Sequence, residues 1–314
     1  MKFLNKKTNI DFMGKRKIAF VTSAVLIIFS IVTLVTRDLN FGLDFTGGTL
    51  IEVSYPTAPE ISDVRSNLSN AGMNDAVVQT FGAASDIVVR IPLLAEEGKS
   101  DAEISTVVLT ALQQGVEGEV VMRRVEFVGP QVGDELKEQG ILAVVYALIG
   151  IFLYVMLRFQ WRFSVGAVTA LVHDIIITMG VLAIVQVEFD LTVVAALLAV
   201  IGYSLNDTIV LFDRIRENFP RLRKASPLEV VNTSVNETLS RTLMTSMTTL
   251  LVLIALFIFG GEIIHAFAFT LIVGVLVGTY SSIYVASTTL LELGVSKFDL
   301  LAVEKEGAGL EQSP

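Results

Sequence analysis

The segment that decides the fold is Leu197–Asn218, with the sequence LLAVIGYSLNDTIVLFDRIREN. It begins as an apolar run, places Asn206 and Asp207 side by side, and resumes the apolar pattern up to Phe212. A carboxylate near the middle of a membrane helix costs about 2.5–3.5 kcal/mol, so such a residue normally faces the interior of a helix bundle. The segment therefore predicts a membrane helix whose buried acid has a function.

The rest of the composition agrees with a membrane protein. The 314 residues are 53% hydrophobic and have a mean hydropathy of +0.67, which is too apolar for a soluble domain of this size. Each of six apolar runs can cross a hydrocarbon core about 30 Å thick, which takes about 20 helical residues. These runs cover residues 18–35, 140–157, 163–185, 191–212, 242–259 and 266–291. We therefore predict a polytopic α-helical membrane protein with six spans.

The positions of Lys and Arg predict the orientation. They gather in the N-terminal tail, in the turn 157–163 and in the segment 213–241, whereas the turns 186–190 and 260–265 hold none. By the positive-inside rule, both termini are cytoplasmic. The long segment 37–138 is then extracytoplasmic, and its 7 basic and 17 acidic residues agree with that placement.

The predicted organisation follows from these runs. Residues 1–17 form a cytoplasmic tail and residues 18–36 a first span, which we interpret as a retained anchor because no small-residue cleavage site follows it. An outer domain, 37–138, precedes five further spans in 139–293, with a cytoplasmic loop at 213–241 and a cytoplasmic tail at 294–314. Within that loop, an amphipathic helix from Pro227 onward is expected to lie on the membrane surface.

The outer domain alternates between strand and helix patterns. Strands are expected at 48–55, 76–81, 87–91 and 119–128, and helices at 59–71 and 101–114. The order β-α-β-β-α-β is typical of a small α+β domain with the ferredoxin-like arrangement. The glycines at its two ends predict either structural turns or mobile hinges, and the sequence leaves both open. These glycines are Gly47, Gly48, Gly129 and Gly133.

A second intramembrane acid lies in the run 163–185. His173 and Asp174 occupy its middle, where a charge is most costly. They belong either to a proton path or to helix packing, in which Asp174 would bond a neighbour such as Thr178. A metal site is disfavoured because no further His lies within a span, and zinc requires several nitrogen or sulfur ligands. The absence of Cys also excludes disulfides and thiolate sites.

Asp207 has one candidate partner of opposite charge. Arg241 begins the 242–259 span from the same end of the membrane, so the two side chains meet if these spans are neighbours. Making and breaking that contact would switch Asp207 between releasing and binding a proton. A fixed ion pair that only locks the helices is the alternative. Tyr203, one turn earlier, and Asn206, beside Asp207, are further relay or packing candidates.

Four motifs carry a resemblance to a known family. They are FGLDFTGGT at 41–49, VHD at 172–174, GYSLNDTIV at 202–210, and the RT and TS pairs at 241–242 and 245–246. With these motifs the chain resembles the SecF members of the SecD/SecF protein-export family, within the resistance-nodulation-division superfamily.

The resemblance implies a function and partners. It implies assembly with a SecD-like subunit, work with the SecYEG translocon on a translocating preprotein, and use of the proton-motive force in the cytoplasmic (inner) membrane. It also implies that Asp207 and Arg241 take part in proton conduction. Two other functions stay open: a proton-driven small-molecule exporter of the same superfamily and a structural assembly subunit. No nucleophile-base arrangement or cofactor loop is found, so we expect no enzyme, no cofactor and no nucleic-acid partner, with membrane lipid around the spans.

Overall fold

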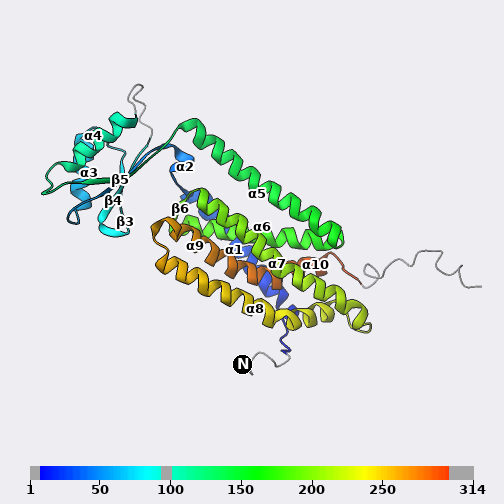
Figure 1. The fold of residues 1–314 in the computed structure, drawn as a ribbon. Helices are drawn as coiled ribbons and strands as arrows, with labels where there is room; N and C mark the ends of the chain where they lie inside the picture. Colours follow the sequence, from blue (N-terminus) through cyan, green and yellow to red (C-terminus); the bar gives the residue numbers. More distant parts are fainter. Residues whose placement is uncertain (1–7, 93–100, 297–314) are drawn as a thin grey trace, which may run out of the picture.

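The computed structural model describes residues 8–92 and 101–296. The predicted tails therefore lie partly outside the described residues, at 1–7 and 297–314. The described part forms a helix bundle with a small sheet domain at one end (Figure 1). We call this end of the bundle the sheet-domain end and the other the far end.

Six helical segments of the described chain are long and apolar enough to cross a membrane, which confirms the predicted number. The first is α1 (Arg16–Arg37), which follows the short helix η1 (Met13–Lys15). The next four are α5 (Pro130–Arg158), α6 (Trp161–Val185), α7 (Leu191–Arg221) and α8 (Pro227–Phe259). The last contains α9 (Glu262–Ser281), a π-helical turn η2 (Ser282–Ala286) and α10 (Ser287–Glu292).

The centre of the bundle is formed by α6 and α7. In their most apolar windows 56% and 50% of the residues are buried, compared with 6% for α5, which runs along the outside. Close approach of the central helices depends on small residues. A Cβ on Gly274 of α9 would overlap Val200 of α7, and one on Gly278 would come within 3.0 Å of Ser204. The small-residue pair that the sequence places at these two positions therefore lies in a tight helix contact.

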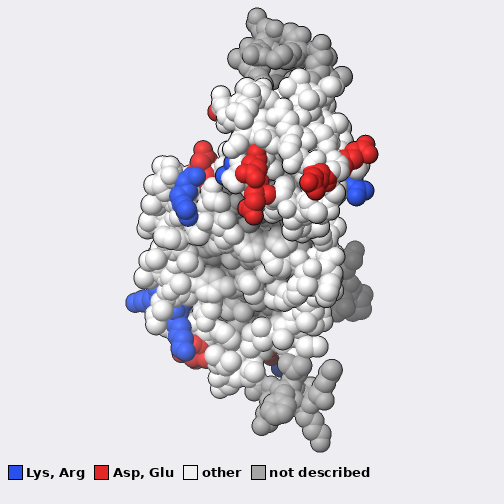
Figure 2. All heavy atoms as spheres, turned by 90° about the vertical axis from the view of Figure 1, so that its left-hand side faces the viewer, with Lys and Arg blue, Asp and Glu red and all other residues white. Residues whose placement is uncertain are grey.

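The sheet domain contains four antiparallel strands and two helices. Its elements are β2 (Gly48–Ser54), α3 (Ile61–Asn70), β3 (Val77–Phe81), β4 (Ala83–Ile91), α4 (Asp101–Gln113) and β5 (Val121–Val128). The strand order is β3-β4-β2-β5. Ile51 and Val89 on one face of the sheet pack with Leu68 of α3 and Leu112 of α4, so that face is apolar and covered. Figure 2 shows acidic side chains gathered near this domain and a broad uncharged zone below them.

A short segment fixes the chain to the bundle before the sheet begins. The strand β1 (Asn40–Phe41) pairs in parallel with β6 (Glu188–Phe189), which lies between α6 and α7. The helix α2 (Leu43–Thr46) follows, and its Asp44 accepts a hydrogen bond from the backbone N–H of Leu191 at 2.9 Å. The motif FGLDFTGGT thus anchors the chain to the start of α7.

The four predicted hinge glycines differ in conformation. Gly47 and Gly48 have φ values of 68° and 126°, which favour glycine; Gly47 ends α2 and Gly48 begins β2. Gly129 is extended and precedes α5. Gly133 lies inside α5, where a Cβ would come within 3.1 Å of the carbonyl oxygen of Phe45. Gly133 therefore lies in a helix rather than in a turn, where its small size allows a close contact between α5 and α2, and a hinge at this position stays a prediction.

The predicted cytoplasmic loop 213–241 is mostly helical. Helix α7 continues to Arg221, and α8 begins at Pro227 after a capping box in which Ser226 and Glu229 bond each other's backbone N–H. No glycine or proline interrupts α8 before Gly260. The predicted surface helix is thus wrong, because the apolar face from Pro227 onward packs against the bundle, where Val231 and Val235 are buried.

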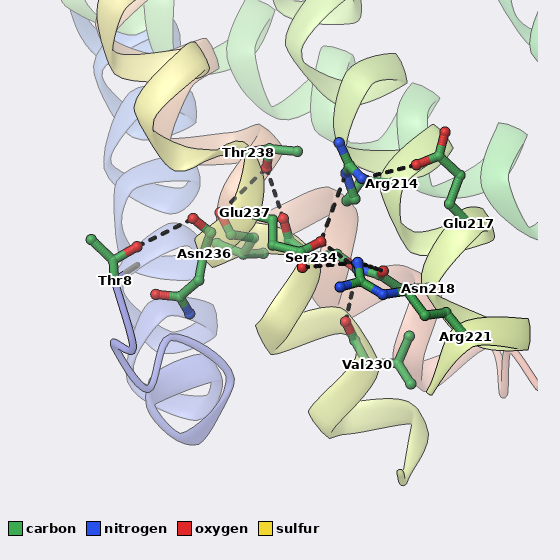
Figure 3. A network of polar contacts seen from close by, with 11 residues as sticks. Thr8, Arg214, Glu217, Asn218, Arg221, Val230, Ser234, Asn236, Glu237 and Thr238 are labelled. Atoms are coloured by element: carbon green, nitrogen blue, oxygen red, sulfur yellow. Dashed lines mark hydrogen bonds and ion pairs between the residues drawn. The ribbon is translucent and has the colours of Figure 1, made fainter. Parts of the chain in front are cut away.

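The segment before α1 binds to the first turns of α8. The Asn232 side chain accepts hydrogen bonds from the N–H groups of Phe12 and Met13 at 2.9 and 3.1 Å. The Asn236 side chain accepts from the N–H of Ile10 and donates to its carbonyl oxygen, both at 2.8 Å. We call residues 8–13 the N-terminal strap. Thr8 and Asn236 are seen side by side in Figure 3.

We predict that Gly274→Ala destabilises the bundle, because the added methyl group must displace Val200 in a contact without free space. Overpacking of this kind typically costs about 1–3 kcal/mol. The control is Gly150→Ala in α5, where a Cβ meets nothing within 4 Å. We expect its effect to stay within about 1 kcal/mol. Thermal unfolding midpoints of the two variants in detergent would test this, and equal midpoints would contradict it.

Candidate functional site

A buried carboxylate joins three central helices. Asp174 of α6 is 1% exposed. Its Oδ2 accepts hydrogen bonds from Ser204 Oγ of α7 at 2.6 Å and from Ser281 Oγ of α9 at 2.8 Å. The predicted Thr178 contact is not formed: within the described chain, the buried Thr178 hydroxyl has no partner. Asp174 therefore bonds to two other helices, α7 and α9, and not to the next turn of α6.

His173 extends this network to the first span. Its Nδ1 lies 3.0 Å from Asp174 Oδ1, and its Nε2 lies 3.2 Å from Ser23 Oγ of α1. Tyr280 of α9 lies 3.1 Å from the same Ser23 hydroxyl and stacks on the imidazole ring with a centroid distance of 6.0 Å. Both oxygens of Asp174 and both nitrogens of His173 thus have polar neighbours.

Asp207, unlike Asp174, has a carboxylate oxygen without a hydrogen-bond partner in the described part of the chain. It is 4% exposed, and its Oδ2 is buried without a hydrogen-bond partner among the described residues. It lies three residues after Ser204 on α7, so the bond from Ser204 to Asp174 fixes the helix one turn away. The adjacent Thr208 hydroxyl is also buried and without a partner in this part of the chain. A buried acid with a free oxygen is suited to binding a proton, because no fixed donor occupies that oxygen.

The structure does not bring Asp207 and Arg241 into contact. Asp207 points into the bundle, whereas the Arg241 side chain is exposed on α8, and no ion pair between described residues joins them. The predicted contact would need a different arrangement of these two side chains.

The two remaining candidates lie on different faces of α7. The Tyr203 hydroxyl donates to Ser246 Oγ of α8 at 3.3 Å, and Ser246 Oγ lies 2.7 Å from Thr279 Oγ1 of α9. This chain of hydroxyls joins three helices and is separate from the Asp174 network. Asn206 is exposed on the outside of the bundle. The structure therefore places Tyr203 in a contact between helices, where a relay or a packing role stays a prediction, and leaves Asn206 outside the buried site.

A third polar network holds α7 to α8 at the far end (Figure 3). The buried Asn218 donates to Ser234 Oγ at 3.0 Å and to Glu237 Oε2 at 2.8 Å. Glu237 also pairs with Arg214 at 3.8 Å and Arg221 at 3.4 Å. These contacts fix the ends of α7 and α8 that lie between Asp207 and Arg241 along the chain.

Sequence reasoning missed the partners of the buried acids. Ser23, Ser204, Ser281 and Tyr280 come from three other segments, and their contacts depend on how the helices pack. The available signal was the presence of serine in otherwise apolar spans, because serine is common at close helix contacts. Among the described residues, no group of three or more His, Cys, Asp or Glu is arranged to hold a metal ion.

Six spans around a buried polar centre, with one sheet domain, define a multi-pass membrane protein. The family model described as "Protein export membrane protein SecD/SecF, C-terminal" matches residues 107–296, and "SecD/SecF GG Motif" matches 32–55. The chain belongs to the SecD/SecF family of protein-export membrane proteins.

Several relatives cover nearly the whole chain. The protein translocase subunit SecF of Vibrio alginolyticus is 53% identical over 99% of both chains. The SecF of Pseudomonas aeruginosa is 52% identical over 93% of this chain and 94% of its own. The SecDF crystal structure from Thermus thermophilus, described as a translocon-associated membrane protein, has a TM-score of 0.81 and 36% identity. It covers 93% of this chain, which spans 39% of that longer one.

We predict that Asp174→Ala and Asp207→Ala, which delete the same atoms from neighbouring helices, differ in stability. Asp174→Ala leaves the buried Ser204 hydroxyl and His173 Nδ1 without this partner, whereas the Ser281 hydroxyl keeps the carbonyl oxygen of Gly278. Each unsatisfied group costs about 1–3 kcal/mol. Asp207→Ala breaks no hydrogen bond of the described structure and removes a buried acid. We expect a large fall in the unfolding midpoint for Asp174→Ala only. Equal falls for the two variants would show that Asp174 does not organise the bundle.

Proposed function

We propose that this chain acts as the SecF subunit of a protein translocase. The single observation that carries the proposal is the near-full-length similarity to SecF subunits, at 53% and 52% identity for the two relatives above. The Thermus SecDF chain includes a region similar to this one and a further region of greater length. We infer that a SecD-like subunit supplies the equivalent of that further region, as a second set of spans beside this bundle.

The proposed setting is the cytoplasmic (inner) membrane, with both termini in the cytoplasm. Support comes from the charge distribution. The basic residues Arg214, Arg216, Arg221, Arg223 and Lys224 lie in or just after the last turns of α7, at the far end, and the acidic sheet domain lies at the other. The sheet domain is then extracytoplasmic, on the side where exported chains emerge. The SecYEG translocon, the preprotein and membrane lipid are the proposed partners.

We propose that the sheet domain has the ferredoxin-like fold. Its β-α-β-β-α-β element order, its strand order β3-β4-β2-β5 and its two helices over one face support this assignment. The domain is joined to the bundle through the Gly47–Gly48 pair and through Gly129. Because both joints contain glycine, we propose that the domain turns about them while it assists a preprotein.

Proton transfer at Asp207 is the proposed source of energy. The buried, unbonded Oδ2 of Asp207 supports a proton-binding role, and the neighbouring Asp174, whose oxygens are both bonded, supports a fixed one. When Asp207 loses its proton, attraction to Arg241 grows, which favours a shift of α8 relative to α7. A proton crossing the membrane provides about 2.3 kcal/mol per 100 mV, enough to bias two arrangements of similar energy.

A structural assembly subunit is the second candidate function, favoured by the many fixed polar contacts between the helices. It needs no titrating group at Asp207. A small-molecule exporter of the same superfamily is the third. The relatives named as translocase subunits argue against it, since the similarity covers the whole of their length.

We predict that Asp207→Asn abolishes the contribution of this chain to export, because the amide cannot release a proton. The measurement is secretion of a reporter protein in cells whose only copy carries the change, with membrane level and co-purification of the SecD-like partner checked. The matched control is Asp213→Asn on the same helix, where the half-buried carboxylate pairs with Arg158 at 3.4 Å near the membrane edge. We expect near-normal export for this control.

Two results would contradict the proton-transfer role. Normal export by the Asp207→Asn variant would support the structural function. Loss of membrane level or of partner binding in that variant, without a similar loss for Asp213→Asn, would assign Asp207 to assembly.

A further inference from the structure

A polar cavity of about 500 Å³ separates the open face of the sheet from the sheet-domain end of the bundle. The apolar face of the sheet is covered by α3 and α4, so the face toward the bundle carries the charged residues. The charged and titratable lining residues come from both parts of the molecule. They are Glu52, Arg90, Arg124 and Glu126 from the sheet, and Asp44, Glu188, Asp190 and His265 from the bundle and its anchoring segment.

One ion pair crosses this cavity. Arg90 in β4 contacts Glu188 in β6, between α6 and α7. The Arg90 side chain is 16% exposed and the Glu188 side chain 33%. The Nε of Arg90 is buried and has no hydrogen-bond partner among the described residues. The Arg90 guanidinium is therefore held in place mainly by its contact with the Glu188 carboxylate.

The ion pair joins the sheet domain, which is connected through glycine joints, to a segment that is fixed to the bundle. The segment before the sheet is fixed to the bundle by several contacts: Gly42 N–H donates to the Phe189 carbonyl at 2.8 Å, and the rings of Phe41, Phe45 and Phe189 pack together. The sheet follows the positive-φ pair Gly47–Gly48. The sheet domain is therefore joined covalently at the glycine joints and non-covalently through Arg90 and Glu188.

We propose that Arg90 and Glu188 form a latch that holds the sheet domain against the bundle, and that this latch opens when the domain turns about its glycine joints. The proposal rests on the proposed function, in which the sheet domain moves during export. It adds that the Arg90–Glu188 contact defines the closed arrangement of the sheet domain, and that these two residues separate when the domain turns.

The environment of Glu188 links the latch to acidity. Burial raises the pKa of Glu188, Asp190 and Asp44 act in the same direction, and Arg90 acts against them. Protonation of Glu188 would remove one of the two charges of the ion pair, so the latch depends on Arg90 to keep this carboxyl group ionised.

We predict that chemically linking the two walls of the cavity stops export. The natural chain has no cysteine, so a pair of introduced cysteines reacts alone. Val88 in β4 and Val187 beside Glu188 both line the cavity, and the pair Val88→Cys with Val187→Cys leaves the latch residues intact. Methanethiosulfonate cross-linkers of increasing spacer length would join them in membranes, and dithiothreitol would release them. We expect export to stop on linking and to recover on release.

A matched pair controls for the chemistry. Glu52 lies directly opposite Val88 on the neighbouring strand β2, so Val88→Cys with Glu52→Cys links two residues within the sheet. This link does not restrict the domain, and we expect export to continue. The proposal is overturned if the Val88–Val187 pair does not link while the control pair does, or if the linked chain still supports full export.

A substitution in the latch gives an independent test. Arg90→Gln removes the charge that offsets the burial of Glu188, so the Val88–Val187 pair should link about fivefold more slowly, as expected for the loss of a partly buried ion pair. Arg124→Gln is the control, because Arg124 pairs with Glu126 inside the sheet. Equal linking rates with and without Arg90 would exclude the latch.

We predict that Glu188→Gln slows the linking of the Val88–Val187 pair relative to the control pair, because it removes the other charge of the ion pair. An unchanged ratio of the two linking rates would contradict the role of Glu188. These tests differ from the test of the function itself: loss of export in Asp207→Asn with full export by the linked chain would reject the latch alone.

Discussion

The structure depends on how a carboxylate is accommodated inside a membrane bundle. In hydrocarbon, an acid must be hydrogen-bonded, paired or protonated, because the ionised group alone is too costly. The two acids on adjacent helices differ in this respect. Asp174 receives bonds from α7 and α9 and contacts His173, so its position is determined by several helices together. Asp207 keeps a buried oxygen without a hydrogen bond among the described residues.

The two acids are coupled through α7. Ser204, bonded to Asp174, lies three residues before Asp207, so the fixed network sets the height and rotation of the helix that carries the free acid. Small residues at the α7–α9 contact bring the backbones close enough for these short side chains to reach one another. In the proposed mechanism, this network keeps α6, α7 and α9 together while α8 shifts.

The sequence predicted the parts of the fold that depend on local pattern. Hydropathy predicted six spans, and alternation predicted the strands and helices of the sheet domain to within a few residues. The sequence did not predict the features that depend on tertiary contacts. An apolar stripe from Val231 to Val235 looks the same for a surface helix and for a helix against the bundle. The contact of Gly133 with α2 likewise gives no sign in the sequence.

The sequence predicted the two acids of the candidate site but not their hydrogen-bond partners. Asp174 and Asp207 were found because charges are rare in membrane spans, whereas Ser23, Ser204 and Ser281 gave no comparable signal. Contact between Asp207 and Arg241 could not be decided from spacing, because it depends on the rotation of two helices. The titration of Asp207 stays a prediction.

The N-terminal strap has a consequence for how the protein is made. Ile10 is held by Asn236, which lies 226 residues later in the chain. At typical synthesis rates of about 5–20 residues per second, that partner leaves the ribosome roughly 11–45 s after the strap itself. The first span must therefore wait in the membrane without this anchorage while three more spans, α5, α6 and α7, are made. Its contact with Tyr280 of α9 forms later still, so the packing of the first helix is completed only by the last span.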